Sequence, residues 1–385
     1  MRWSRRLPVD LSPSPLSETL ADLQGTVDLT ESNPTKVGLG PADLDSCLAP
    51  AGAALYRPEA LGLDTARSAV AAYAARHGLT IPADRLALTA STSEAYAVLF
   101  KLLCDPGDRI AVPAPSYPLF DVLAELENVE LTRYQLTYSG RWHLDLDSVA
   151  AALDAGARAV VAVLPNNPTG STFTAAEAQA LKELCARRDV PLVADEVFRP
   201  YACGETPLAS LGADPIGLTF VLDGLSKALA LPQLKLGWIA VAGPDAPARQ
   251  ALQRLEWIAD AYLSVATPVQ LALPALFERA AAVQARVRER VAANRDHLAA
   301  LVATVPAAEV LEADGGWYAV LRLPASVPEE DLVVELARTA KVLVHPGFYY
   351  DFTSETHLVL ALIQPPDLFA AAGARMRAVL ARHFG

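Results

Sequence analysis

The stretch AVVAVLPNNPTG, residues 159–170, is the part of the chain from which the fold is best inferred. Its first six residues form an unbroken apolar run, which is typical of a strand buried on both faces of a parallel sheet. A rigid polar turn, PNNPTG, follows directly. Because ligands bind at the carboxyl ends of strands in open parallel sheets, this turn also marks the expected position of a site.

Strands and helices are expected to alternate over residues 64–222. The expected strands lie at 85–89, 109–113, 129–136, 159–164, 191–194 and 218–222. The expected helices lie at 64–77, 92–104, 116–128, 147–155 and 175–188. This alternation predicts an α/β fold in which a mostly parallel sheet lies between two layers of helices.

The two ends of the chain have different patterns. Residues 1–35 are rich in turn-forming residues and predict an N-terminal arm. A long helix rich in Ala, Arg and Glu is expected at about 276–303, followed by a mixture of strands at 315–321 and 357–362 and a helix at 328–340. We therefore expect an arm over 1–35 that packs with the small domain, a large domain over 36–275, and a small α+β domain over 276–385.

The composition restricts the class of protein. A chain of 385 residues, 52% of them hydrophobic, can bury a large core, and a net charge of −12 argues against a nucleic-acid-binding role. No apolar segment typical of a signal peptide or a membrane span is found, so we expect a cytoplasmic protein that does not bind membranes. The four cysteines are widely scattered, which predicts buried thiols and no metal site.

Polar side chains follow several of the expected strands. Asn167 lies in the turn quoted above, Asp195 ends the next expected strand, and Lys227 follows the strand after that. A hydroxyl-rich segment, STS at residues 91–93, opens a helix at the end of another strand. Because the carboxyl ends of parallel strands meet at one edge of a sheet, we expect these groups to converge.

Each of these features has a structural and a functional interpretation. Ser91 and Glu94 match a helix capping box, but free N–H groups and hydroxyls at a helix N-terminus also bind phosphate. A buried Asp195 needs a cationic or N–H partner, which a pyridinium nitrogen would supply. Lys227 is either a surface charge or, in a pocket, an amine that forms an imine.

Three ordered motifs carry a resemblance to a known family. They are NNPTG at 166–170, DEVF at 195–198 and SK at 226–227, with LGW behind the third at 236–238. With these motifs the chain resembles the class I/II aminotransferases of fold type I, the aspartate aminotransferase superfamily, collinearly from residue 32 to about residue 362. The resemblance implies pyridoxal 5′-phosphate (PLP) as cofactor, a seven-stranded sheet in the large domain, and a homodimer with shared active sites.

The resemblance also implies roles for the matching residues. Lys227 would hold PLP as a Schiff base and shuttle a proton between the substrate Cα and the cofactor C4′. Asp195 would pair with the pyridinium nitrogen, and Asn167 would donate to the ring O3′. The other implied contacts are Tyr117, stacked on the ring; Ser91, Thr92, Ser93, Ser226 and Lys235, around the phosphate; Tyr56, at the phosphate of the neighbouring subunit; and Asn33, on the arm that closes over the substrate.

Two residues of the expected cofactor site depart from the family. Phe198 stands where the family usually has a tyrosine whose hydroxyl donates to O3′, and this loss should raise the pKa of the lysine-bound cofactor. Lys235 stands where an arginine usually binds the phosphate, so the charge is kept but the two-pronged hydrogen bonding is lost.

The third departure concerns the substrate. The family holds the substrate α-carboxylate with an arginine on a late strand, and Val359 takes its place here. Either other groups bind the carboxylate, or the substrate lacks one at that position. The candidate groups, which the sequence does not rank, are Asn33, Asn167, Arg199, Lys235, His345, Tyr349 and Tyr350.

We expect an aminotransferase that moves an amino group between an amino acid, or an amine, and a 2-oxo acid through a pyridoxamine form. A PLP-dependent lyase or decarboxylase of the same fold is the alternative, because the same lysine and electron sink serve those reactions. A non-catalytic PLP-binding sensor is a further alternative. It is disfavoured because Lys227 and Asp195 are both present and no basic DNA-binding segment precedes the domain.

Overall fold

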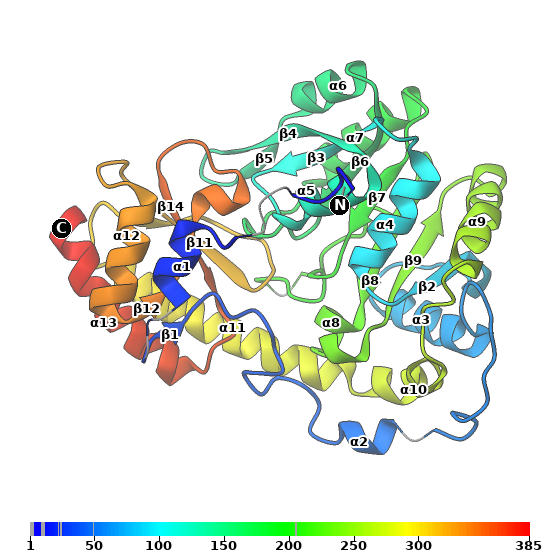
Figure 1. The fold of residues 1–385 in the computed structure, drawn as a ribbon, viewed down its shortest axis with the longest axis horizontal. Helices are drawn as coiled ribbons and strands as arrows, with labels where there is room; N and C mark the ends of the chain where they lie inside the picture. The colour runs from blue at the N-terminus through cyan, green and yellow to red at the C-terminus, as the bar shows by residue number, and fades with distance from the viewer. Residues whose placement is uncertain (1–3, 9–11, 22, 24, 49, 205) are drawn as a thin grey trace.

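One large sheet carries the strand ends at which the polar residues were expected (Figure 1). The computed structural model describes residues 4–8, 12–21, 23, 25–48, 50–204 and 206–385. Over that part of the chain the sheet has eight strands in the order β2-β9-β8-β7-β6-β3-β4-β5. Their bounds are β2 (Leu86–Thr89), β3 (Arg109–Ala114), β4 (Glu130–Tyr138), β5 (Trp142–Leu144), β6 (Ala157–Val163), β7 (Leu192–Asp195), β8 (Thr219–Gly224) and β9 (Gly237–Ala242).

Most neighbouring strands are parallel, as predicted. The pairs β4–β3, β3–β6, β6–β7 and β7–β8 are parallel, whereas β9 runs antiparallel to both β8 and β2. The sheet has one strand more than the seven expected, because β5 adds a short antiparallel edge to β4. With only three residues, β5 is too short for alternating hydrophobicity to reveal it.

Helices cover both faces of the sheet, and β6 is the strand that shows this best. Ala159, Val161 and Val163 pack against α4, α5 and α9 on one face. Val160 and Ala162 face α3, α6, α7 and α10 on the other. The bounds of these helices are α3 (Asp64–Arg76), α4 (Thr92–Leu103), α5 (Leu119–Glu127), α6 (Leu146–Asp154), α7 (Ala175–Arg187), α9 (Asp245–Asp260) and α10 (Thr267–Glu278). The unbroken apolar run therefore reflects burial on both sides.

A second, antiparallel sheet has the strand order β10-β11-β14-β13. Its apolar residues share a core with α11, α12 and α13, which lie together in Figure 1. The bounds are β10 (Glu309–Val310), β11 (Tyr318–Leu323), β13 (His345–Pro346), β14 (Thr356–Ala361), α11 (Ala280–Val302), α12 (Glu329–Glu335) and α13 (Pro366–Phe384). This is the mixture of helix and strand expected beyond residue 275.

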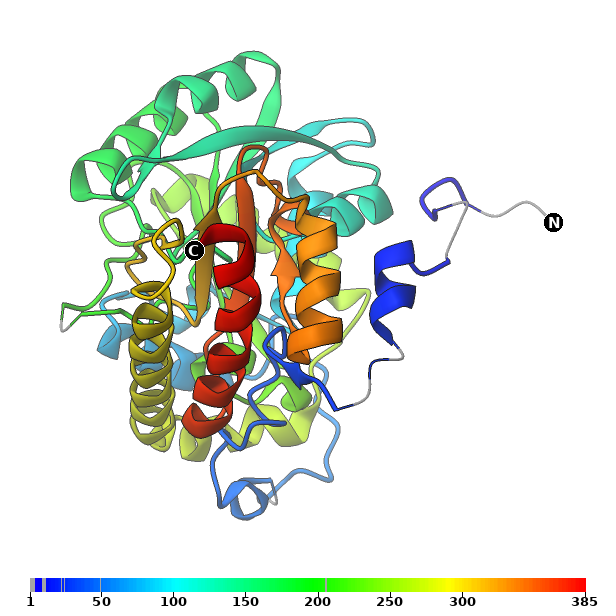
Figure 2. The same ribbon diagram turned by 90° about the vertical axis from the view of Figure 1, so that its left-hand side faces the viewer.

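The N-terminal segment lies against this second part of the molecule. β1 (Val27–Asp28) pairs in parallel with β12 (Val342–Leu343). Helix α1 (Pro15–Ala21) contacts α12, and Figure 2 shows the two side by side. The long helix expected at 276–303 is instead divided at Arg279 between α10 and α11. The expected boundary after residue 275 thus falls inside α10, and the division into domains stays a prediction.

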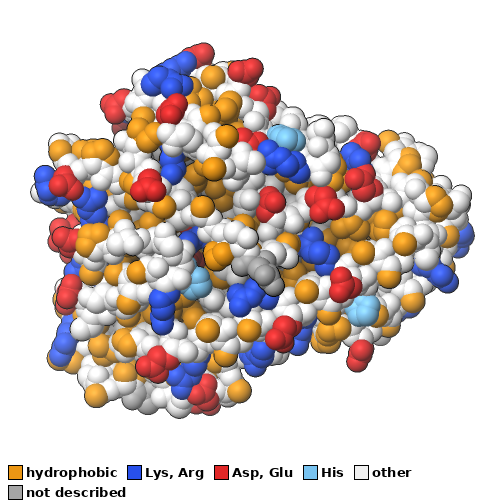
Figure 3. Space-filling view, turned by 180° about the vertical axis from the view of Figure 1, so that it is seen from behind, with side chains coloured by type: hydrophobic (Ala, Val, Ile, Leu, Met, Phe, Trp, Pro, Cys, Tyr) orange, Lys and Arg blue, Asp and Glu red, His pale blue; other side chains and the backbone are white. Residues whose placement is uncertain are grey.

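The surface seen from behind carries acidic and basic side chains close to one another (Figure 3). None of the helices in the described ranges combines the length and the apolar character needed to cross a bilayer.

Candidate functional site

The carboxyl ends of three neighbouring strands open into one pocket. The turn after β6 carries Asn167, β7 ends at Asp195, and β8 leads into the short helix α8 (Leu225–Ala228), which carries Lys227. The residues that line the pocket are Ser32, Thr92, Tyr117, Val163, Asn167, Asp195, Val197, Phe198, Lys227 and Tyr318. The structure therefore brings together the amide, the carboxylate and the amine that the strand order predicted.

The amine of Lys227 lies among aromatic rings. Its Nζ is 4.6 Å from the ring centroid of Trp317 and 5.4 Å from that of Phe198. Burial lowers the pKa of Lys227 to about 8, while the charge of Asp195 opposes this shift. The amine is therefore neutral, and nucleophilic, to a larger extent near neutral pH than that of an exposed lysine.

The carboxylate of Asp195 is buried and receives two hydrogen bonds. The Tyr96 hydroxyl donates to Oδ2 at 2.9 Å, and the Val197 backbone N–H donates to Oδ1 at 3.3 Å. Burial raises the pKa of Asp195, whereas these two donors and the Lys227 charge lower it. A cation in the pocket facing this carboxylate would offset the remaining cost of burying it.

The turn after β6 is held by its own hydrogen bonds. Asn166 Nδ2 donates to the Pro115 carbonyl at 3.0 Å and to Thr169 Oγ1 at 2.9 Å, and the Gly170 N–H donates to the Asn166 carbonyl at 2.8 Å. Asn167 is left facing the pocket, where its Oδ1 is buried without a hydrogen-bond partner among the described residues. Because an unpaired buried amide oxygen is costly, this atom points to a missing ligand group.

Aromatic side chains form the walls of the pocket. Tyr117 is 39% exposed, and burial raises its pKa to about 12, so its hydroxyl is protonated near neutral pH. Phe198 is buried, and its ring meets Trp317 edge-on at a centroid distance of 5.1 Å. Tyr318 meets the same phenylalanine edge-on at 5.9 Å.

The N-terminus of α4 lies at the pocket, and the first residue of β9 packs closely against it. Ser91 Oγ accepts a hydrogen bond from the Glu94 N–H at 3.1 Å and so caps the helix. A Cβ atom at Gly237 would stand 3.1 Å from the Ser91 carbonyl carbon and 3.2 Å from the Thr92 nitrogen. A side chain at residue 237 would therefore have to push these backbone atoms away by a few tenths of an ångström, and glycine suits the close approach of β9 to the helix.

The other residues predicted to bind phosphate lie on segments that adjoin this helix end. The Leu225 N–H donates to the Leu236 carbonyl at 2.9 Å, which joins the segment of Ser226 to that of Lys235. Lys235 has a left-handed backbone with φ 49°. Of the five predicted phosphate contacts, Thr92 lines the pocket, whereas Ser91, Ser93, Ser226 and Lys235 are not among its lining residues.

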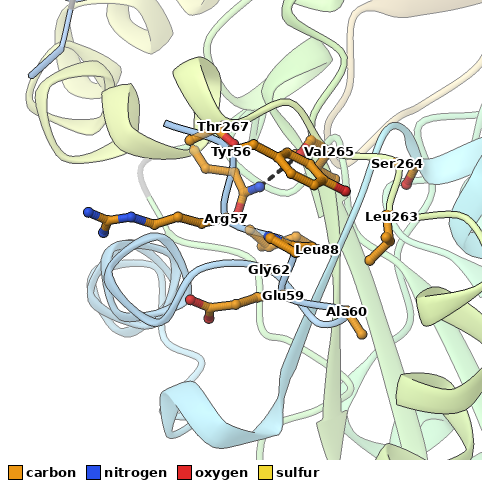
Figure 4. Close-up of a pocket in the computed structure, with 12 residues that line it drawn as sticks. Tyr56, Arg57, Glu59, Ala60, Gly62, Leu88, Leu263, Ser264, Val265 and Thr267 are labelled. Carbon is orange, nitrogen blue, oxygen red and sulfur yellow. Dashed lines mark hydrogen bonds between the residues drawn. The ribbon is translucent and has the colours of Figure 1, made fainter. Parts of the chain in front are cut away.

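Tyr56 lies outside the pocket of Lys227. It is 69% exposed and lines a separate hollow together with Arg57, Leu263 and Ser264. Figure 4 shows this hollow, with the Arg57 side chain extending away from Leu263 and Ser264. Within a single chain, Tyr56 is therefore not part of the Lys227 pocket.

Three residues predicted to contact the substrate, Asn33, His345 and Tyr349, are not among those that line the pocket. Asn33 Oδ1 accepts hydrogen bonds from the backbone N–H and the hydroxyl of Thr35, at 3.0 and 2.7 Å. His345 Nδ1 lies 2.9 Å from the Tyr350 hydroxyl, and its ring contacts that of Tyr349 at 5.8 Å. The arm residue that lines the pocket is Ser32.

Arg199 and Val359 are both occupied in other ways. Arg199 Nε lies 2.9 Å from Glu196 Oε2, with side chains that are 7% and 1% exposed, and its guanidinium also donates to the His77 carbonyl. Because the buried Glu196 charge requires this partner, the structure offers no support for Arg199 as a substrate ligand. Val359 is buried in β14 opposite Val320, within the core of the second sheet.

Sequence reasoning missed several side chains of this site. Tyr96 stands four residues after Thr92, so the helical period could have placed both on one face of α4. Tyr318 and Trp317 follow the glycine pair at residues 315–316 on a distant strand, and no local pattern links them to Lys227. In the part of the chain that the structure describes, no group of three or more His, Cys, Asp or Glu side chains could hold a metal ion.

Comparison with known proteins identifies the family of this chain. A family model described as aminotransferase class I and II matches residues 51–372. The chain belongs to this family. The S-alkyl-thiohydroximate lyase of Arabidopsis thaliana is 32% identical over 231 residues, which cover 58% of this chain and 49% of that protein. The alanine aminotransferase of Mycobacterium tuberculosis is 26% identical over 302 residues, which cover 76% of this chain and 70% of that protein.

The structural comparison shows which known structures share the fold of this chain. The alanine aminotransferase from Pyrococcus furiosus matches with a TM-score of 0.91 at 21% identity, over 99% of this chain and 100% of that one. At 21% identity this likeness establishes the fold of the chain. The chain spans about half the length of the first curated relatives that it matches.

The reactivity of Lys227 tests the electrostatics of the pocket. In the protein without cofactor, competitive labelling by acetic anhydride, measured by peptide mass spectrometry, should give a midpoint near pH 8. The neutral amine is the reactive form, and burial disfavours the charged one. Asp195→Asn should lower the midpoint further, because it removes the charge that raises this pKa. A wild-type midpoint at 10.5, the ordinary lysine value, would contradict the burial of the amine.

Proposed function

We propose that this protein is a PLP-dependent aminotransferase that transfers an amino group between an amino acid, or an amine, and a 2-oxo acid. The observation that carries the proposal is the convergence of Lys227, Asp195 and Asn167 on one pocket at the carboxyl ends of neighbouring strands. Membership of the class I and II aminotransferase family supports the same conclusion.

The residues of the pocket fit PLP. Among the described residues Lys227 is the one cation that acts on the buried Asp195 carboxylate, and a protonated ring nitrogen would be a further cationic partner. The side-chain amide of Asn167 has a buried, unpaired atom, and a ring oxygen would pair with it once the amide is turned to present its N–H. Thr92 and the N-terminus of α4 suit the phosphate group. When bound, PLP supplies an electron sink for the substrate Cα.

Each of these side chains has a separate role in the proposed reaction. Lys227 Nζ would hold the cofactor through a covalent bond and would take the proton from the substrate Cα. Its lowered pKa suits this role, because a larger fraction of the amine is then neutral, and able to accept a proton, near neutral pH than in an exposed lysine. Asp195 would keep a proton on the ring nitrogen, and Tyr96 holds the Asp195 carboxylate in place. Tyr117 lines the pocket and would offer its ring as a stacking surface.

A lyase is the second candidate, because a relative named as a lyase is 32% identical over 58% of this chain. The pocket suits both reactions, because a lyase that releases ammonia and a keto acid also begins with removal of the Cα proton and differs in then expelling a leaving group from Cβ. The place of the missing arginine is filled by the buried Val359, so amines and amino acids should both be tried as donors.

Mixing the holoenzyme with an amino donor alone separates the two reactions. For an aminotransferase we expect a stoichiometric shift of the cofactor absorbance to the pyridoxamine band, with one equivalent of keto product per site and no further turnover. Adding a 2-oxo acid should restore the original band. Continuous release of ammonia and a keto acid without an acceptor would instead establish lyase chemistry. Lys227→Ala is the control and should lose the covalent band.

We further propose a cytoplasmic homodimer with shared active sites. The exposed Tyr56 supports the dimer, because it lines a hollow with Leu263, next to the 55% exposed Tyr262, and not the pocket of its own chain. The family resemblance assigns this tyrosine to the phosphate group in the neighbouring subunit. The cytoplasmic assignment is supported by the four cysteines, Cys47, Cys104, Cys185 and Cys203, which are present as free thiols.

Mixing two inactive variants tests the shared site. Tyr56→Ala and Lys227→Ala should each have strongly reduced activity, but a mixed dimer regains one site that has both residues intact. After unfolding and refolding of an equal mixture, we expect recovery of about a quarter of wild-type activity, since half of the dimers are mixed. No recovery, with mixed dimers detected by native mass spectrometry, would contradict the assignment of Tyr56 to the neighbouring site.

A further inference from the structure

Phe198 leaves one wall of the pocket without the hydroxyl that the family resemblance leads one to expect. The ring of Tyr318 meets Phe198 edge-on, with centroids 5.9 Å apart and an interplanar angle of 87°. Both side chains line the pocket together with Asn167. Tyr318 thus brings a phenolic hydroxyl into the same wall from β11, a strand of the second sheet.

Close contacts between two turns determine where Tyr318 stands. The Gly315 N–H donates to the Gly170 carbonyl at 2.9 Å, and Gly170 ends the turn that carries Asn167. A Cβ atom at Gly315 would stand only 2.7 Å from Pro165 Cγ, in the same turn, and 2.7 Å from the Tyr201 carbonyl oxygen. Because only glycine permits this approach, the segment leading into β11 is seated directly on the turn at residues 165–170. The position of Tyr318 relative to Asn167 is therefore set by backbone contacts.

The hydroxyl of Tyr318 is a donor in the neutral pH range. Burial raises the pKa of Tyr318, while the side chains of Ser32, Trp317 and Asn167 lower it. The phenol therefore stays protonated, and its hydrogen is available to an acceptor. The ionisable side chains near it are those of Glu31, Tyr117, Asp195, Lys227 and Tyr350.

We propose that the Tyr318 hydroxyl donates a hydrogen bond to the ring O3′ of bound PLP and so replaces the tyrosine that Phe198 has displaced. The Asn167 side chain, whose Oδ1 atom has no partner among the described residues, contacts this hydroxyl, so the two present neighbouring polar groups to the same part of the pocket, which suits one negatively charged oxygen. The inference rests on the proposed function, because it assumes that PLP is the ligand.

The consequence concerns the proton on the lysine-derived nitrogen next to O3′. An O3′ oxygen that accepts fewer hydrogen bonds from the protein stays more negative and holds that proton more tightly, so the pKa of the nitrogen rises. Tyr318 would thus keep this pKa lower than the presence of Phe198 alone implies, and would partly cancel the effect expected from that replacement.

A pH titration of the bound cofactor's absorbance tests the inference. Tyr318→Phe should raise the apparent pKa of the lysine-bound cofactor by about one unit, the size expected for one charge-assisted hydrogen bond. Phe198→Tyr should lower it by about one unit in the Tyr318→Phe background, but by less than about a third of that in wild type, where a donor is already present. Tyr134→Phe is the matched control and should leave this pKa unchanged, because its hydroxyl donates to the Val161 carbonyl in the core.

The outcomes separate the two claims. A wild-type protein without any lysine-bound absorbance band would overturn the proposed function. A normal band whose pKa is the same in Tyr318→Phe would overturn only the role of Tyr318. If Tyr318→Phe does not fold, Phe198→Tyr alone still decides: a shift below about a third of a unit supports a donor already in place, and a full unit contradicts it.

Discussion

The burial of one carboxylate and one amine in the same pocket is the constraint on which the rest of the site depends. Burial raises the pKa of Asp195 and lowers that of Lys227, and each group partly stabilises the charge of the other. Both groups lie at the ends of the adjacent strands β7 and β8. The Tyr96 hydroxyl donates a hydrogen bond to Asp195 and so offsets part of the cost of burying its charge. A cofactor with a cationic ring nitrogen and a reactive carbonyl matches both unsatisfied groups.

The second sheet contributes to this pocket through the contact between Gly315 and the turn at residues 165–170. That contact places Trp317 beside the Lys227 amine and Tyr318 beside Phe198. The aromatic surroundings that lower the pKa of Lys227 by excluding water are thus built from two sheets that lie far apart in the sequence. The effect of having Phe198 where the family usually has a tyrosine therefore depends also on the residues of the second sheet that contact it.

Some of the site could be read from local sequence, and some could not. Asn167, Asp195 and Lys227 come at or a few residues after the ends of apolar runs, and strand ends are where parallel sheets gather ligands, so their convergence was predictable. Tyr318 depends on long-range packing of β11, and β5 was too short to show a period. Arg199 looked available as a cation, yet Glu196, buried three residues earlier, binds it. This buried ion pair depends on how the chain folds, and the composition of the sequence alone does not reveal it.

The identity of the lysine that carries the cofactor is the central claim, and it can be measured directly. The holoenzyme is reduced with borohydride, digested, and searched by mass spectrometry for peptides that bear a pyridoxyl group. We expect the label on Lys227, and on no peptide of the Lys227→Ala variant. A pyridoxyl group on Lys235 or Lys182, or a reduced protein without any label, would contradict the site described for this chain.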